Sequence, residues 1–360
     1  MKRFAGTAAL GLYLCVVLAV RMHAQNATPT FTTIDAPGAG TGANQGTEAQ
    51  SINTAGTITG TYMDGNNVVH SFVRVADGTI TNFDAPGAAG TFSRSVNTAG
   101  AIAGFYYDAN SAAHAFARSA SGAIVRFGAA GAGGDANQGT FAESINTSGV
   151  IAGYFGDASN VYHGFVRAAG GAITSFDAPA STGTFAFAIN TAGTIAGYYF
   201  DASNVIHGFV RTAGGAITTF DAPGAGTGGN QGTLGGSINT SEAIAGFYYD
   251  AALAAHGLVR AASGAITDFD AAGAGTGADQ GTFGYSLNAA GAIAGVCADA
   301  SNVYHGLVRA ASGTITKFEA PGAGTGAYHG TLARSINKTG SITGYYVDAS
   351  NVFHGFLRTP

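Results

Sequence analysis

Seven histidines recur at fixed positions in this sequence, and they are the first residues that could carry chemistry. Each stands 17 residues after an asparagine, and five stand 14 residues before an acidic residue. Imidazoles beside carboxylates can act as acid–base pairs or as metal ligands. The histidines are His70, His114, His163, His207, His256, His305 and His354.

The periodicity of the histidines favours a structural role. Equivalent positions in a ring of repeats lie far apart unless they line a central channel, so they cannot converge on one substrate or metal ion. The turn from Val75 to Thr79 contains a glycine that suits a three-residue hairpin, which sets Val75 opposite Thr79. Counting outward, His70 then faces Asp84, and we predict a charge-assisted hydrogen bond between them.

The same register predicts further pairs between neighbouring strands. They are His163 with Asp177, His207 with Asp221, His256 with Asp270, His305 with Glu319, and His354 with Asp35 across a closure of the two chain ends. His114 faces Gly128 in this register, and we expect it to have no acidic partner.

Four D-A-S-N segments resemble calcium loops only weakly. Each offers one carboxylate, whereas Ca²⁺ takes six to eight oxygen ligands. An aspartate that begins a tight turn and accepts hydrogen bonds from the backbone two residues on is the better interpretation. We therefore predict no metal site and no cofactor.

One position differs strongly between copies of the repeat and could recognise a ligand. It is the residue before the serine of S-I-N or its equivalent: Gln50, Arg94, Glu143, Phe187, Gly236, Tyr285 and Arg334. We expect it on the innermost strand of each unit, forming a ring at the channel mouth near the end that receives the crossover loops. Aromatic faces and charged groups together can stack on and hydrogen-bond a sugar. Alternatively, these residues fill the channel or pack between units.

The elements that position these residues are short strands in a repeat of 44 or 49 residues. The repeat asparagine falls at seven places: Asn53, Asn97, Asn146, Asn190, Asn239, Asn288 and Asn337. In the fourth copy, alternating patterns predict strands at about 184–190, 194–200, 205–212 and 216–221, joined by turns of hairpin length. Four antiparallel strands in a unit of this size are typical of a propeller blade.

The two ends of the repeat array complement each other. Residues 30–38 match the end of a repeat, whereas the last copy stops near Arg358 and lacks that segment. We therefore predict an all-β fold, a seven-bladed β-propeller of four-stranded antiparallel blades in which the N-terminal strand completes the last blade. A solenoid would instead leave two open ends. The expected blades are about 47–87, 91–130, 140–179, 184–223, 233–272, 282–321, and 331–360 with 30–37.

Residues 1–24 combine Lys2 and Arg3 with an apolar run and a small residue at Ala24, which indicates a secretory signal peptide. An uncleaved N-terminal anchor is the alternative. We expect a single propeller over 25–360, secreted or periplasmic and without a membrane segment.

Residues 1–24 hold three of the 15 basic side chains, leaving 12 against 20 acidic ones, so nucleic acid is an unsuitable partner. The 58 glycines argue against long helices.

The recurring strings S-I-N-x-x-G-x-I-x-G and H-G-F-x-R resemble the HAF-type extracellular repeat. Here they stand, for example, at Ser144-Ile145-Asn146 and His163-Gly164-Phe165-Val166-Arg167. The resemblance covers essentially all of the chain after the signal peptide. It implies an exported bacterial repeat protein, and it assigns no catalytic or binding residues.

The sequence favours a binding protein over an enzyme. Of the non-periodic carboxylates, only Glu143 is expected to reach the channel, and a propeller hydrolase or lyase needs unlike groups in one place. We expect a monomeric binder of a polysaccharide or cell-envelope component. An envelope scaffold for protein partners and, third, a propeller lyase or glycosidase are the alternatives.

Overall fold

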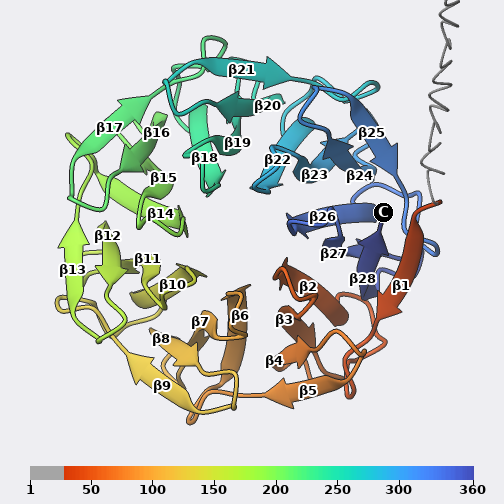
Figure 1. Cartoon of the computed structure of the whole chain (residues 1–360), viewed down its shortest axis with the longest axis horizontal. Coiled ribbons are helices and arrows are strands. Elements are labelled where there is room, and N and C mark those ends of the chain that lie inside the picture. Colours follow the sequence, from red (N-terminus) through yellow and green to blue (C-terminus); the bar gives the residue numbers. More distant parts are fainter. Residues whose placement is uncertain (1–27) are drawn as a thin grey trace, which may run out of the picture.

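The computed structural model describes residues 28–360, so the predicted signal peptide lies outside the described residues. These residues form 28 strands in four-stranded antiparallel units. Figure 1 shows the units arranged around a central axis, as the blades of a propeller are. No helix within 28–360 is long and apolar enough to span a membrane.

The four strands of each unit have nearly the same lengths throughout. The innermost strands are β2 (Gly46–Ile52), β6 (Gly90–Val96), β10 (Gly139–Ile145), β14 (Gly183–Ile189), β18 (Gly232–Ile238), β22 (Gly281–Leu287) and β26 (Gly330–Ile336). The second strands are β3 (Ile58–Met63), β7 (Ile102–Tyr107), β11 (Ile151–Gly156), β15 (Ile195–Phe200), β19 (Ile244–Tyr249), β23 (Ile293–Ala298) and β27 (Ile342–Val347).

The third strands are β4 (Val69–Arg74), β8 (Ala113–Arg118), β12 (Tyr162–Arg167), β16 (Ile206–Arg211), β20 (Ala255–Arg260), β24 (Tyr304–Arg309) and β28 (Phe353–Thr359). The outer strands are β5 (Ile80–Phe83), β9 (Ile124–Phe127), β13 (Ile173–Phe176), β17 (Ile217–Phe220), β21 (Ile266–Phe269), β25 (Ile315–Phe318) and β1 (Thr30–Ile34). The strands predicted for the fourth copy agree with β14 to β17 to within one residue at each end.

The core lies between neighbouring units. In one typical cluster, Ala152 of β11 packs against Ala186, Ile195 and Phe209 of the next unit, and all four side chains are fully buried. Small residues on one sheet and large residues on the next allow the sheets to approach closely. Burial between sheets therefore holds the units together.

The N-terminal strand pairs with the C-terminal strand. β1 is antiparallel to β28, with Thr30 opposite Thr359 and Ile34 opposite Gly355. Ile34 is 1% exposed and packs in the cluster of β2, β3 and β4. The chain ends thus lie side by side, and β1 supplies the outer strand of the last unit (Figure 1).

The seven repeat asparagines, here called the asparagine ring, form a continuous circle of hydrogen bonds at the turn that follows each innermost strand. Each side-chain Nδ2 donates to the backbone oxygen of the next asparagine, at 2.8 to 3.2 Å. The last of these bonds runs from Asn337 back to Asn53. The Oδ1 of Asn239 accepts from the backbone N–H groups of Ser241 and Ala243, which fixes the turn. One residue type thus closes the turn and links the units.

Candidate functional site

The variable position lies at a β-bulge in every innermost strand. The pairing of β2 with β3 shifts between Ala49 and Ser51, which leaves Gln50 without a partner. Equivalent shifts occur at the other six positions. A bulged residue is free of the ladder, and its side chain is re-aimed. The backbone therefore allows this position to vary in size and charge without loss of strand pairing.

All seven of these residues line one cavity of about 320 Å³ in the channel. We call them the channel ring: Gln50, Arg94, Glu143, Phe187, Gly236, Tyr285 and Arg334. The cavity is also lined by Tyr198, Leu234, Gly235 and Phe247. The expectation that the seven residues surround the channel agrees with this geometry.

The ring lies deeper than the sequence indicates. We expect it near the strand end that receives the crossover loops, but Gln50 is the fifth of the seven residues of β2. Three residues later, Asn53 already lines a second cavity of about 470 Å³ at the opposite end of the channel. The prediction is wrong in this detail because the channel ring lies past the middle of the innermost strand.

The polar residues of the channel ring form one continuous arc. Arg94 Nε donates to Glu143 Oε2 at 2.8 Å, and the Glu143 side chain is only 4% exposed. The charge of Glu143 raises the pKa of Arg94. Arg334 Nε donates to Gln50 Oε1 at 3.4 Å. Two guanidinium groups and one buried carboxylate therefore face the cavity from this side.

The rest of the ring is apolar. Phe187 stacks on Tyr198 at 5.3 Å between ring centroids. Tyr285 packs against Phe247 at 6.2 Å. Gly236 adds no side chain between Phe187 and Tyr285, so room remains between two aromatic surfaces. The channel ring thus divides into a polar arc and an aromatic arc.

Glu48 is a site residue that the sequence does not place at the channel. At the equivalent position of three other units, an aromatic pair stacks across the two inner strands, as Phe92 does on Phe105 at 5.1 Å. In this unit the pair is Glu48 opposite Thr61, and a cavity of about 250 Å³ remains there. Gln50, Arg94 and Arg334 line this cavity as well as the first. The signal in the sequence is an acid where the other copies have phenylalanine or leucine.

Burial raises the pKa of Glu48, although the charges of Arg334 and Arg94 oppose the shift. Its Oε2 accepts a hydrogen bond from Gln50 Nε2 at 3.0 Å. Gln50 therefore bridges Glu48 and Arg334, and the cavities on either side of it share one hydrogen-bonded network.

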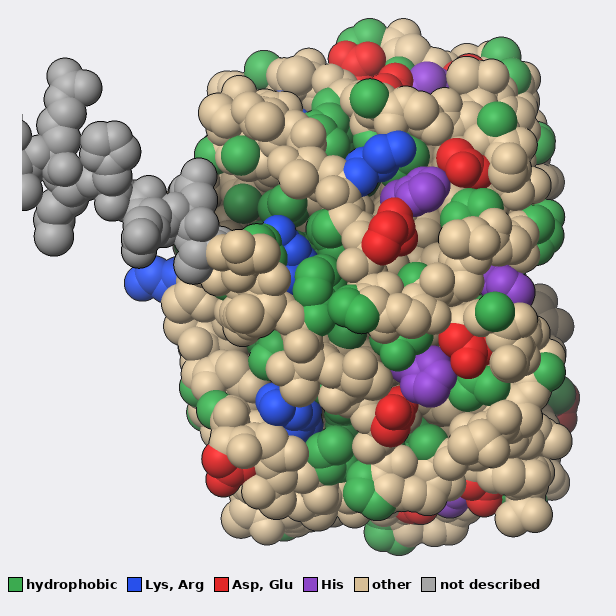
Figure 2. Space-filling view, turned by 90° about the vertical axis from the view of Figure 1, so that its right-hand side faces the viewer, with side chains coloured by type: hydrophobic (Ala, Val, Ile, Leu, Met, Phe, Trp, Pro, Cys, Tyr) green, Lys and Arg blue, Asp and Glu red, His purple; other side chains and the backbone are tan. Residues whose placement is uncertain are grey.

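The histidines form separate clusters on the outer wall, where Figure 2 shows them with acidic side chains beside them. Each of the six predicted partners is hydrogen-bonded to the histidine Nδ1. The distances are 2.8 Å for His70 and Asp84, 3.0 Å for His163 and Asp177, 3.0 Å for His207 and Asp221, 2.9 Å for His256 and Asp270, 2.5 Å for His305 and Glu319, and 2.9 Å for His354 and Asp35. The sequence register therefore describes the geometry of these pairs.

Each histidine has a carboxylate at its Nε2 that the sequence interpretation misses; it is a second partner for six of them and the single partner for His114. His70 Nε2 lies 3.6 Å from Oδ2 of Asp64, whose Oδ1 accepts from the backbone of Asn66 and Val68. The expectation that His114 lacks an acid is wrong, because Asp108 contacts its Nε2 at 2.9 Å. An aspartate six residues before every repeat histidine is the signal that could have found this partner.

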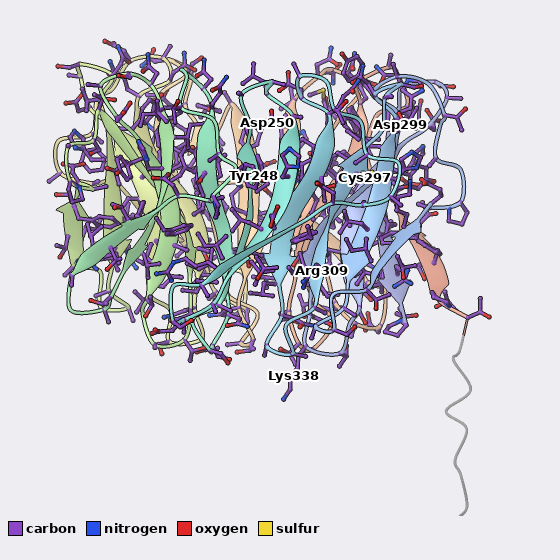
Figure 3. The ribbon with its side chains drawn as sticks, turned by 90° about the horizontal axis from the view of Figure 1, so that it is seen from above. Tyr248, Asp250, Cys297, Asp299, Arg309 and Lys338 are labelled. Atoms are coloured by element: carbon purple, nitrogen blue, oxygen red, sulfur yellow. The ribbon has the colours of Figure 1, made fainter. Side chains whose placement is uncertain are left out.

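These outer clusters fit a scaffold role. Asp250 and Asp299 lie near one face of the disc, and Lys338 lies at the opposite face (Figure 3). His256 also stacks on Tyr248 at 4.9 Å, so its ring is fixed on every side. Among residues 28–360, no group of three or more histidine, cysteine or acidic side chains is arranged to hold a metal ion.

The fold is similar to those of a lectin and of two hydrolytic enzymes. BP39L lectin from Burkholderia pseudomallei matches with a TM-score of 0.53 at 11% identity, over 86% of this chain and 94% of the lectin. A puromycin hydrolase matches with a TM-score of 0.52 at 12% identity, over 87% of this chain and 50% of the enzyme. A puromycin-hydrolyzing peptidase from Mycobacterium tuberculosis also gives 0.52 at 12%, over 84% of this chain and 49% of the peptidase.

These similarities show the fold alone, because proteins of different activity share it at low identity. The chain spans about half the length of the two enzymes. No protein-family model matches the sequence, and no curated protein is similar to it at a significant level.

Proposed function

We propose that this protein is an exported, monomeric, seven-bladed β-propeller that binds an extracellular or cell-envelope carbohydrate in its central channel without transforming it. The observation that carries the proposal is the division of the channel ring into a polar arc and an aromatic arc around one cavity. A sugar ring has apolar C–H faces and a polar edge of hydroxyl groups. Aromatic side chains stack on such faces, while arginine, glutamine and carboxylate groups hydrogen-bond the edge.

Two further features support this proposal. A lectin of similar fold is matched over almost its whole length, so the architecture is compatible with sugar binding. The repeat strings, such as Ser144-Ile145-Asn146, resemble the HAF-type extracellular repeat, and the signal peptide predicted at residues 1–24 agrees with export.

A second candidate function is glycoside hydrolysis. The sequence provides one channel carboxylate, Glu143, whereas the geometry adds Glu48 beside the same arginines. Burial raises the pKa of Glu48, and Glu143 is ion-paired with Arg94. Two carboxyl groups in unlike environments are what acid–base cleavage of a glycosidic bond requires. New reducing ends after incubation with a bound glycan, lost in Glu48→Gln, would favour this candidate over a binder.

A glycan-binding screen on the purified protein tests the proposed function. The comparison variant carries alanine at Arg94, Phe187, Tyr285 and Arg334, which removes both arcs and leaves the strand ladder intact. We expect the native protein to retain at least one polysaccharide or oligosaccharide class and the variant to retain none. Failure of the native protein to bind any glycan, with a protein partner captured instead, would favour an envelope scaffold.

A further inference from the structure

We infer that the carbohydrate bound in the channel is acidic, and that its carboxylate lies beside Arg334 while a sugar ring packs on the aromatic arc. The inference rests on the proposed function and adds the chemical class of the ligand. It would fit a glycan that contains uronic acid.

The charges around the channel cavity do not balance. Arg94 and Arg334 both line it, whereas Glu143 is the one carboxylate among its lining residues. Of the arginines in residues 28–360, only Arg94 forms an ion pair with a carboxylate. Arg334 therefore faces the cavity without a carboxylate within ion-pair distance, because Glu48 reaches it only through Gln50.

Arg334 is held in place without being neutralised. Its guanidinium carbon lies 4.9 Å from the ring centroid of Tyr285, and its Nε makes one long hydrogen bond to Gln50. Arg334 also hydrogen-bonds the Tyr285 side chain, and its other N–H groups have no hydrogen-bond partner among residues 28–360. A planar guanidinium with free donors, already oriented on an aromatic ring, suits bidentate binding of a carboxylate.

Six of the seven arginines that end the H-G-F-x-R string or its equivalent show what a purely structural arginine looks like here. They stack on phenylalanine rings between units at 4.6 to 5.0 Å, and their Nε atoms are buried without partners. These six are Arg118, Arg167, Arg211, Arg260, Arg309 and Arg358. Arg334 differs because it lines two cavities and not a packed interface.

Glu48 sets how strongly the site attracts an anion. It reaches Arg334 through Gln50, so its ionised form offsets part of the arginine charge. Because burial raises the pKa of Glu48 above that of an ordinary glutamate, this offset disappears as the pH falls toward values at which an exposed carboxylate is still ionised. The acidic ligand should therefore bind more tightly as the pH falls and Glu48 takes up a proton.

Calorimetric titration with two matched ligands tests the inference. The probes are β-1,4-linked trisaccharides of glucuronate and of glucose, which differ only at C6, where one has a carboxylate and the other a hydroxymethyl group. We expect the acidic trisaccharide to bind at least about tenfold more tightly, since a hydrogen-bonded ion pair is worth this much. Arg334→Gln should remove that preference, and Glu48→Gln should increase it about threefold or more at pH 7 and abolish its pH dependence.

Lys338→Gln is the matched control, because it removes the same charge from the asparagine-ring end of the channel. It should leave the preference unchanged. Equal affinity for the two trisaccharides, or equal effects of Arg334→Gln and Lys338→Gln, would overturn the inference while leaving the proposed function intact. Failure of every neutral and acidic glycan to bind would overturn both.

Discussion

The asparagine ring and the channel ring lie only three residues apart in every copy of the repeat, yet they differ completely in composition. One position is asparagine in every copy, whereas the other carries both charges, aromatic rings and glycine. Each asparagine must accept from its own turn and donate to the next unit, so another side chain in its place would lose at least one of the two contacts. The bulged position has no such partner, and it is free to serve a ligand.

Positions that hold the same residue type in every copy of the repeat therefore build the scaffold, whereas a position whose residue type differs between copies is the candidate site. The histidine clusters follow the same rule, since they repeat in every unit and lie on the outer wall (Figure 2). Substitutions of scaffold residues should therefore lower stability, whereas substitutions in the channel ring should lower ligand binding.

Removal of residues 25–38 should have the largest effect on stability. It takes away β1, exposes the edge of β28 and uncovers the cluster that buries Ile34. We expect the free energy of unfolding to fall by at least about 3 kcal/mol, with association through the open edge. Urea unfolding and light scattering measure this, with a chain that begins at Pro29 as the control. A truncated protein that stays monomeric and equally stable would show that the closure contributes little.

Asn239→Ala should have the next largest effect. It removes one hydrogen bond between units and two within the turn, and we expect a loss of about 2–3 kcal/mol. Thr240→Ala in the same turn is the control, because this side chain is exposed and should cost less than about 0.5 kcal/mol. Equal losses in urea unfolding would mean that the asparagine ring is not what fixes the turn.

Arg211→Met should cost about 1 kcal/mol, because the guanidinium lies 4.6 Å from the ring centroid of Phe176. Arg74→Met is a natural comparison. The outer strand of the preceding unit has Ile34 in place of that phenylalanine, so no aromatic ring is lost there. Arg74→Met should change the free energy of unfolding by less than half as much. The same loss in both variants would exclude the cation–π contact as the cause.

His256→Asn should change the pH dependence of stability more than stability itself. Burial alone would lower the pKa of His256, but the hydrogen bonds and charges of Asp270 and Asp250 outweigh it and raise the pKa. Because the folded value lies above the ordinary one, the stabilising contribution is complete below about pH 6.5 and is lost as the pH rises through the folded pKa.

Asp250 behaves in the opposite way at low pH. Burial would raise its pKa, but backbone N–H groups of Ala254 and Ala252 and the His256 ring lower it. Its contribution is therefore complete above about pH 4 and is lost as the pH falls further.

Melting temperatures of the native protein should drop from pH 6 to pH 8 by more than those of His256→Asn. If the melting temperatures of the two proteins changed with pH in parallel, the histidine clusters would not contribute to the stability of the scaffold.

Much of this fold could be predicted from the sequence, because turn residues and spacing repeat with the units. The glycine of the turn after Val75 fixes the register that brings His70 to Asp84. Residues 30–38 match the end of a repeat, and this match predicts the pairing of β1 with β28. The bulge at Gln50 could not be predicted, since an extra residue that is present in every copy leaves no irregularity in the period. The role of Glu48 depends on side chains from two neighbouring units, which no single repeat contains.

The most direct test of the central claim compares affinity and stability in the variant with alanine at Arg94, Phe187, Tyr285 and Arg334. We expect the affinity of this variant for a glycan that the native protein binds to fall at least about a hundredfold. We also expect the variant to stay folded, because none of the four side chains belongs to the asparagine ring or to the strand ladder. Its melting temperature should fall moderately, since Tyr285 packs against a buried cluster and Glu143 loses its ion partner. Undiminished binding by the folded variant would contradict the account and place recognition outside the channel ring.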